Sequence, residues 1–151
     1  MFSLFKKKDL FTVDENERIV AAIRNSEKRT SGEIRIFIES RNPLVNTLER
    51  AALIFSKLKM EETEHRNGVL LYIASKDKEL ALFGDKGIHE QVGTAYWEQQ
   101  VQEMLQKFRE ENLVDGIVNC ITHIGETLCE KFPYMANEDK NELPDEIIFG
   151  K

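Results

Sequence analysis

Three short polar segments contain residues that could hold a metal ion. They carry Glu33, Asn67 and Asp85, and each lies beside a predicted strand. Carboxylate and amide oxygens are hard ligands, which suit calcium or magnesium better than zinc. Gly84 and Gly87 bracket Asp85 and leave the backbone free to bend closely around an ion. These residue types therefore predict a divalent-cation site.

The segment that contains Asp85 also precedes a predicted helix, whose first amides can meet an anion. Lys86 and Gly87 are the candidate anion-binding residues. The alternative is that the glycines only form a turn and Asp85 only caps the helix, and spacing alone favours this simpler interpretation. His89 is the one histidine near the segment. It could act as an acid or base, although a residue of the first helical turn is the simpler interpretation.

Motifs for several other chemistries are missing from the sequence. There is no P-loop, no G-x-S-x-G, no G-x-G-x-x-G, no D-x-D after a strand and no cysteine followed five residues later by arginine. The repeating-acid calcium loop is absent as well, and no histidine pairs with a cysteine at zinc-site spacing. The common routes to a covalent phosphoryl intermediate are therefore excluded.

Composition is that of a soluble globular domain of 151 residues with a net charge of −6. The acidic balance argues against a nucleic-acid partner, and no apolar run reaches the ~20 residues that span a bilayer. The basic residues of the first segment follow its apolar residues, which is the reverse of a secretory signal, so we expect a cytoplasmic monomer. Cys120 and Cys129 lie on opposite sides of one predicted helix and cannot form a disulfide with each other, so we expect both to be reduced and buried.

The elements that must position the candidate site are predicted from periodicity. In chain order they are a helix over 12–28 with a Thr12–Glu15 capping box, a strand over 33–39, a helix over 47–60, strands over 69–74 and 80–83, helices over 96–108 and 113–132, and a short edge strand over 147–149. A strand, a helix and a strand in succession imply a parallel pair joined by a right-handed crossover. The next strand returns as a hairpin. The starts of the first two strands and the end of the third therefore meet at one edge, where the candidate residues lie.

This order predicts an α/β fold, a three-layer α/β/α sandwich with a small mixed sheet. Residues 1–11 form a leader of uncertain order, 12–132 form the domain, and 133–151 form an acidic tail that we expect to pack on its surface.

With these residues in hand, the chain resembles the TPM domain family, named for a thylakoid lumen phosphatase, a photosystem II repair protein and a nematode receptor modulator. The matching stretches are 67–71 (NGVLL), the loop 84–88 (GDKGI) and 115–117 (DGI) at the start of the last helix. Arg66 stands where relatives often have aspartate, and the loop has Asp-Lys where many relatives have tyrosine.

The resemblance implies an α/β/α sandwich with a divalent-metal site, calcium in preference to magnesium, held by Asn67 and Asp85 and, by inferred proximity, Glu33. It implies two functions: a calcium-binding interaction or repair module, or a metal-assisted acid phosphatase acting on phosphate monoesters, with Lys86 steadying the anion. A third possibility is a module that binds an unidentified protein partner through the leader or the tail.

Overall fold

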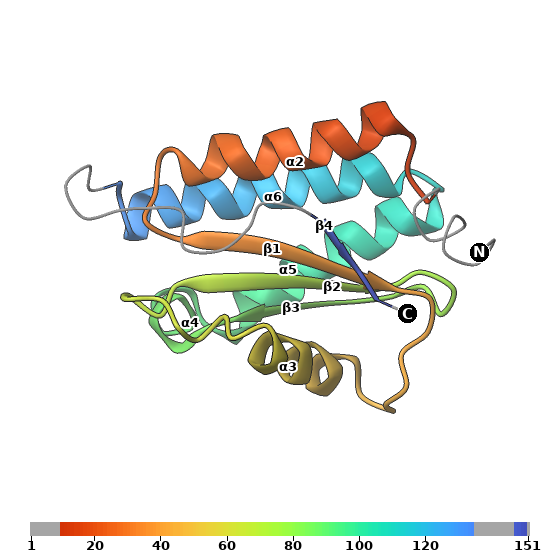
Figure 1. The fold of residues 1–151 in the computed structure, drawn as a ribbon, viewed down its shortest axis with the longest axis horizontal. Helices are drawn as coiled ribbons and strands as arrows, with labels where there is room; N and C mark the ends of the chain where they lie inside the picture. Colours follow the sequence, from red (N-terminus) through yellow and green to blue (C-terminus); the bar gives the residue numbers. More distant parts are fainter. Residues whose placement is uncertain (1–9, 135–146, 151) are drawn as a thin grey trace.

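The computed structural model describes residues 10–134 and 147–150. Its elements in chain order are α2 (Val13–Glu27), β1 (Glu33–Glu39), α3 (Thr47–Lys57), β2 (Gly68–Ala74), β3 (Glu79–Gly84), α4 (Lys86–Val92), α5 (Thr94–Arg109), α6 (Leu113–Lys131) and β4 (Ile147–Phe149). The four strands form one mixed sheet in the order β3-β2-β1-β4 (Figure 1).

Helices cover both faces of the sheet, which confirms the predicted α/β/α sandwich. One face carries the larger core, to which α2, α4, α5 and α6 all contribute, and α3 covers the other face (Figure 1). Every residue of β2 is buried, as expected for an unbroken apolar run in a central strand with both faces covered. Leu71 faces the larger core and Tyr72 the core beneath α3, so β2 links the two.

The strand connections confirm the predicted meeting of three segments at one edge. β1 and β2 are parallel, with Glu33 opposite Gly68, and β3 is antiparallel to β2, with Gly84 opposite Val69. Backbone hydrogen bonds extend this pairing past the strand ends. The Asp85 N–H donates to the Gly68 carbonyl at 2.9 Å. The start of β1, the start of β2 and the end of β3 therefore lie side by side.

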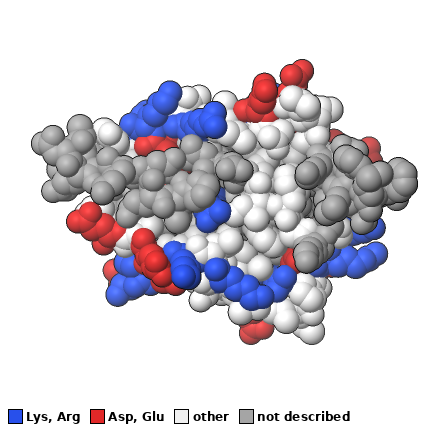
Figure 2. Space-filling model, viewed as in Figure 1, with Lys and Arg blue, Asp and Glu red and all other residues white. Residues whose placement is uncertain are grey.

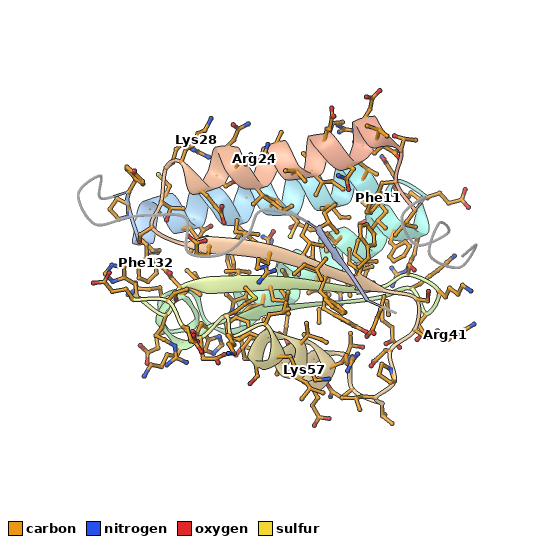
Figure 3. The ribbon with its side chains drawn as sticks, in the orientation of Figure 1. Phe11, Arg24, Lys28, Arg41, Lys57 and Phe132 are labelled. Atoms are coloured by element: carbon orange, nitrogen blue, oxygen red, sulfur yellow. The ribbon has the colours of Figure 1, made fainter. Side chains whose placement is uncertain are left out.

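The start of α2 is fixed as its sequence predicts. Thr12 accepts from the Glu15 N–H and the Glu15 carboxylate accepts from the Thr12 N–H, which completes the capping box. Phe11, just before it, is buried in the larger core (Figure 3). The described end of the leader is thus part of the packed domain, whereas the expectation for residues 1–9 lies outside the described residues.

Helix α3 ends three residues before the predicted end at Met60. Lys59 takes a left-handed conformation (φ 57°), and the N–H groups of Lys59 and Met60 donate back to Ser56 and Phe55. This is the pattern of a Schellman motif, in which glycine is the usual residue at the left-handed position. Because lysine occupies that position, the sequence does not indicate that the helix ends there. Met60 is buried beneath the helix, so the apolar pattern continues past the true end.

Strand β4 confirms the short edge strand predicted near the end of the chain, and it pairs in parallel with β1. The expected packing of the acidic tail over 135–146 lies outside the described residues. Both cysteines are free thiols, as predicted. Cys120 is buried, but Cys129 is only partly so, which corrects the expectation that both are buried.

The described surface carries charges of both signs. Basic and acidic side chains appear between uncharged residues on the face in Figure 2. Among residues 10–134 and 147–150, no helix is both long and apolar enough to span a bilayer.

Candidate functional site

The structure brings all three predicted metal ligands to the same edge of the sheet. Glu33 is the first residue of β1, Asn67 directly precedes β2, and Asp85 directly follows β3. The Glu33 N–H donates to the Asn67 carbonyl at 3.4 Å. All three residues are buried, Asn67 to 1% exposure. Two carboxylates and an amide are therefore withdrawn from water within three adjacent segments.

Their side chains divide between the two faces of the sheet. Side chains alternate along a strand, so residues paired across strands share a face. Glu33 and Asp85 both pair with Gly68, where an added Cβ would lie 3.7 Å from Phe55 of α3. The two carboxylates accordingly belong to the α3 side. Asn67 precedes Gly68 and belongs to the other side, so the three side chains can meet only around the rim.

The amide of Asn67 is half satisfied. Its Nδ2 donates to Ser31 Oγ at 3.1 Å. Its Oδ1 is buried and has no hydrogen-bond donor among the described residues. A buried acceptor left without a donor costs about 1–3 kcal/mol. This oxygen is the atom predicted to be a metal ligand, and a cation would satisfy it.

Asp85 already has a cationic partner in Arg66. Arg66 Nε and Nη2 lie 2.6 and 2.8 Å from the two carboxylate oxygens, and the Lys86 N–H donates to Oδ1 at 2.8 Å. The hydrogen bond to Asp85 raises the pKa of Arg66 above its ordinary value. Arg66 itself has a left-handed backbone (φ 51°), which sequence reasoning had no signal to detect. The ion pair neutralises the charge of Asp85.

The predicted anion-binding amides also have protein acceptors. The Lys86 N–H donates to Asp85, and the Gly87 N–H donates to the Arg66 carbonyl at 2.8 Å. An anion at this edge would therefore contact the exposed ammonium of Lys86, which has no ion pair among the described residues. Gly87 is required sterically, since an added Cβ would lie 2.2 Å from the His65 carbonyl oxygen.

His89 is positioned by a tryptophan. Trp97 Nε1 donates to His89 Nδ1 at 3.1 Å. This hydrogen bond holds the His89 ring against the Trp97 side chain on α5. His89 lies in the short helix α4, as the simpler interpretation of the sequence predicts.

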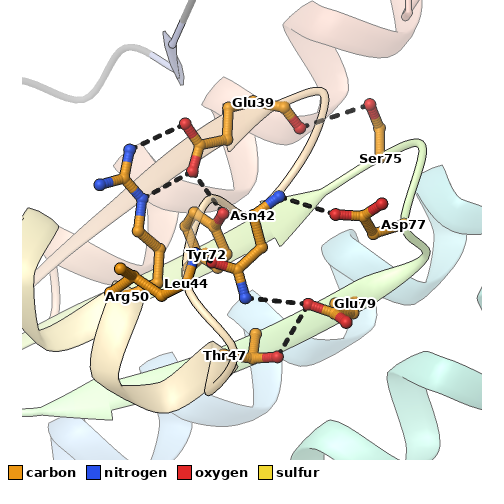
Figure 4. Close-up of polar contacts among 9 residues, drawn as sticks. All are labelled: Glu39, Asn42, Leu44, Thr47, Arg50, Tyr72, Ser75, Asp77 and Glu79. Atoms are coloured by element: carbon orange, nitrogen blue, oxygen red, sulfur yellow. Dashed lines mark hydrogen bonds and ion pairs between the residues drawn. The ribbon is translucent and has the colours of Figure 1, made fainter.

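A second buried polar cluster lies at the opposite ends of β1 and β2, and sequence reasoning missed it. Glu39 accepts two hydrogen bonds from Arg50, at 2.8 and 2.9 Å, and another from the Tyr72 hydroxyl (Figure 4). Nearby, Asp77 and Glu79 hold the loop between β1 and α3 through Asn42, Thr47 and Arg41. Each of the three carboxylates accepts at least one hydrogen bond, so this cluster positions the loop.

Within residues 10–134 and 147–150, no group of three or more histidine, cysteine, aspartate or glutamate side chains is placed to hold a metal ion. A cation at the predicted edge would therefore depend on a mixed set of oxygens, with the Asn67 amide among them. Calcium accepts such mixed sets of carboxylate, amide, carbonyl and water oxygens.

Comparisons with known proteins agree with this fold. BA42 from the psychrophilic bacterium Bizionia argentinensis is 38% identical, with a TM-score of 0.84 over 93% of this chain and 95% of that chain. The N-terminal domain of the cg2496 protein from Corynebacterium glutamicum has a TM-score of 0.59 at 14% identity, over 78% of this chain and 74% of that chain, and so shares the fold alone. A comparison with curated proteins gives no match.

A family model described as the TPM domain matches residues 4–127. That match takes in both the strand segment that begins at Asn67 and the loop around Asp85. The chain therefore belongs to the TPM domain family.

Proposed function

We propose that this domain binds a divalent cation, calcium in preference to magnesium, at the sheet edge formed by Glu33, Asn67 and Asp85. The observation that carries the proposal is the buried Asn67 Oδ1, an acceptor without a donor among the described residues. Two buried carboxylates lie on the adjoining segments. Binding a cation there would give the amide oxygen the partner it lacks and would serve an interaction or repair module.

The ion pair of Arg66 and Asp85 limits the affinity. Asp85 can join a cation only when Arg66 releases it, and the Arg66 side chain is 38% exposed and so has room to move into water. Calcium sites with few charged ligands have dissociation constants of about 0.1–1 mM. We expect the dissociation constant of this site to lie in that range or to be larger, which means weaker binding.

Calcium and magnesium titrations followed by amide chemical shifts test the proposal directly. We expect shifts at Asn67, Gly68 and the segment 85–87 on adding calcium to about 10 mM, with smaller shifts for magnesium. Asn67→Ala removes the amide oxygen and should abolish them. Asn119→Ala is the matched control, because Asn119 is exposed on α6.

Two results would contradict calcium binding at this edge. One is the absence of any shift in the segment 85–87 up to that concentration. The other is an unchanged titration in Asn67→Ala. A thermal unfolding scan of each variant separates lost binding from lost folding.

A metal-assisted phosphatase is the second candidate, and the exposed Lys86 beside Asp85 favours it. An ammonium there can contact a phosphate whose charge a bound metal partly neutralises. Calcium- or magnesium-dependent turnover of p-nitrophenyl phosphate that is lost in Asp85→Ala would support it. Equal turnover by both proteins would indicate a contaminating enzyme. We rank it second because Asp85, the acid next to Lys86, is already paired with Arg66.

A further inference from the structure

A groove of about 1030 Å³ runs along β3. Strand residues 80–84 form its floor, the start of α3 forms one wall and α5 forms the other. Its apolar wall residues are Val45, Leu48, Trp97 and Val101. At one end the groove reaches Lys86 and His89. It is therefore an apolar channel with a strand at its base.

Among the strands that the structure describes, β3 is the outer one, so one of its backbone edges has no neighbour in that sheet. The hydrogen bond from Asp85 N–H to the Gly68 carbonyl fixes which groups point outward. Bonded and non-bonded pairs alternate in an antiparallel ladder, so Phe83 and Ala81 bond to β2. The N–H and C=O groups of the intervening residues, Leu80, Leu82 and Gly84, face the groove. Within the described chain, no backbone hydrogen bond outside the ladder reaches them.

The two walls of the groove decide what can occupy it. Leu48 and Val45 on the α3 wall are 52% and 102% exposed, whereas Leu82 on the floor belongs to the larger core. A second folded copy would present its own β3 between the same walls, so its strand could not descend to this floor. A single extended segment can. It would turn successive side chains toward α3 and α5, both of which offer apolar contacts.

A basic side chain at one end of the groove would orient a bound segment. Lys86 lines the end where β3 finishes, and it has no ion pair among the described residues. A carboxylate on the bound segment would meet it there. The α5 wall carries the carboxylate of Glu98 together with the neutral side chains of Gln99 and Gln102. Lys86 therefore suits an apolar segment with one acidic end, and Glu98 disfavours further acidic residues along that segment.

We propose that this groove binds an extended peptide of a partner protein as an added strand on β3, with consecutive apolar side chains and a carboxylate placed at Lys86. The backbone groups of Leu80, Leu82 and Gly84 supply the hydrogen bonds, and the two walls select apolar residues. This site adjoins the proposed cation site, because Asp85 and Lys86 line its end, but binding here requires neither Asn67 nor calcium.

The test uses the full chain and synthetic peptides of about six residues, the usual length of a strand. Central positions carry valine, isoleucine, leucine or phenylalanine, and aspartate stands at either the first or the last position. Trp97 is the sole tryptophan of the chain and lines the groove, so its fluorescence reports binding. The best peptide is then followed by amide hydrogen exchange. We expect exchange at Leu80, Leu82 and Gly84 to slow on the order of tenfold or more.

Matched variants locate the contact. Leu48→Gln should weaken the binding of the best peptide about tenfold, because apolar burial is lost. Leu53→Gln makes the same change on the same helix outside the groove and should leave affinity unchanged. Lys86→Glu should weaken the binding of the acidic peptide about fivefold. Its control is Lys57→Glu, an exposed site on α3 outside the groove (Figure 3).

Backbone pairing is tested on the peptide. N-methyl groups on the amides that face β3 should abolish binding, whereas methyl groups on the alternate amides should not. The proposal is overturned if no peptide binds below about 1 mM. It is also overturned if binding protects none of the three amides, which would indicate a small-molecule pocket, or if those amides are protected by raising the protein concentration alone, which would indicate pairing between copies.

Discussion

Arg66 and Asp85 form a two-bond ion pair that joins the loop before β2 to the loop after β3, with N–O distances of 2.6 and 2.8 Å. The carboxylate is buried and the guanidinium is partly exposed. A fixed guanidinium thus stands where a metal ion would have to approach Asp85. The same pair holds two of the three segments that form the proposed cation site.

Arg66→Gln should strengthen calcium binding, because it removes the cation that competes for Asp85. We expect the dissociation constant to fall about tenfold, equivalent to ~1.4 kcal/mol. Amide shifts at the segment 85–87 measure it. Arg41→Gln is the control, since Arg41 forms an exposed ion pair with Asp77 in a different loop. An unchanged calcium midpoint in Arg66→Gln would show that the ion pair does not limit binding.

Gly87→Ala should destabilise the domain by about 2 kcal/mol or more, because the new methyl group meets backbone and cannot be accommodated by a side-chain rotation. Its Cβ would lie 2.2 Å from the His65 carbonyl and 2.6 Å from the Arg66 carbonyl. Urea unfolding measures the loss. Gly116→Ala on α6 is the comparison, since the atoms nearest its Cβ, from 2.9 Å, are side-chain atoms of Lys107 and Met104 and not backbone. Equal losses of stability in the two variants would rule out a steric requirement for glycine that is particular to position 87.

The topology follows from sequence because it depends on periodicity and connection rules alone. The apolar run of β2, the alternation in β1 and the helix between them were enough to bring Glu33, Asn67 and Asp85 to one edge. The division of their side chains between two faces also follows from strand alternation. It became evident only once the register placed both carboxylates opposite Gly68.

The polar partners could not be derived in the same way. Arg66 reaches Asp85 because its backbone is left-handed. Arginine rarely adopts this conformation, so the sequence gives no indication of it. Glu39 and Arg50 lie on a strand and on the following helix, so their contact depends on how that helix packs. Charged residues on one side of β1 suggest a solvated face, but α3 covers that face and Glu39 is buried.

Arg50→Ala should be strongly destabilising, because it leaves the buried carboxylate of Glu39 without its cation. The free energy of unfolding should fall by about 3–5 kcal/mol, the usual cost of removing one partner of a buried ion pair. Arg41→Ala, which breaks an exposed pair, should cost less than about 1 kcal/mol. Chemical unfolding of both variants makes the comparison. Similar small losses would mean that water reaches Glu39 once Arg50 is gone.

Tyr72 should make the domain lose stability at alkaline pH. Burial, and then its hydrogen bond to Glu39, raise the pKa of the Tyr72 hydroxyl well above its ordinary value. A raised pKa in the folded state means that the stabilisation is complete below the unfolded pKa of about 10 and is lost as the pH rises above it.

Unfolding measured between neutral pH and about pH 11 tests this, since the unfolded tyrosine ionises within that interval. The free energy of unfolding should fall more steeply with pH in the wild type than in Tyr72→Phe, which has no hydroxyl to ionise. Tyr134→Phe, at an exposed position, should follow the wild-type slope. Parallel curves for the wild type and Tyr72→Phe would mean that the Tyr72 hydroxyl ionises as readily in the folded chain as in the unfolded one.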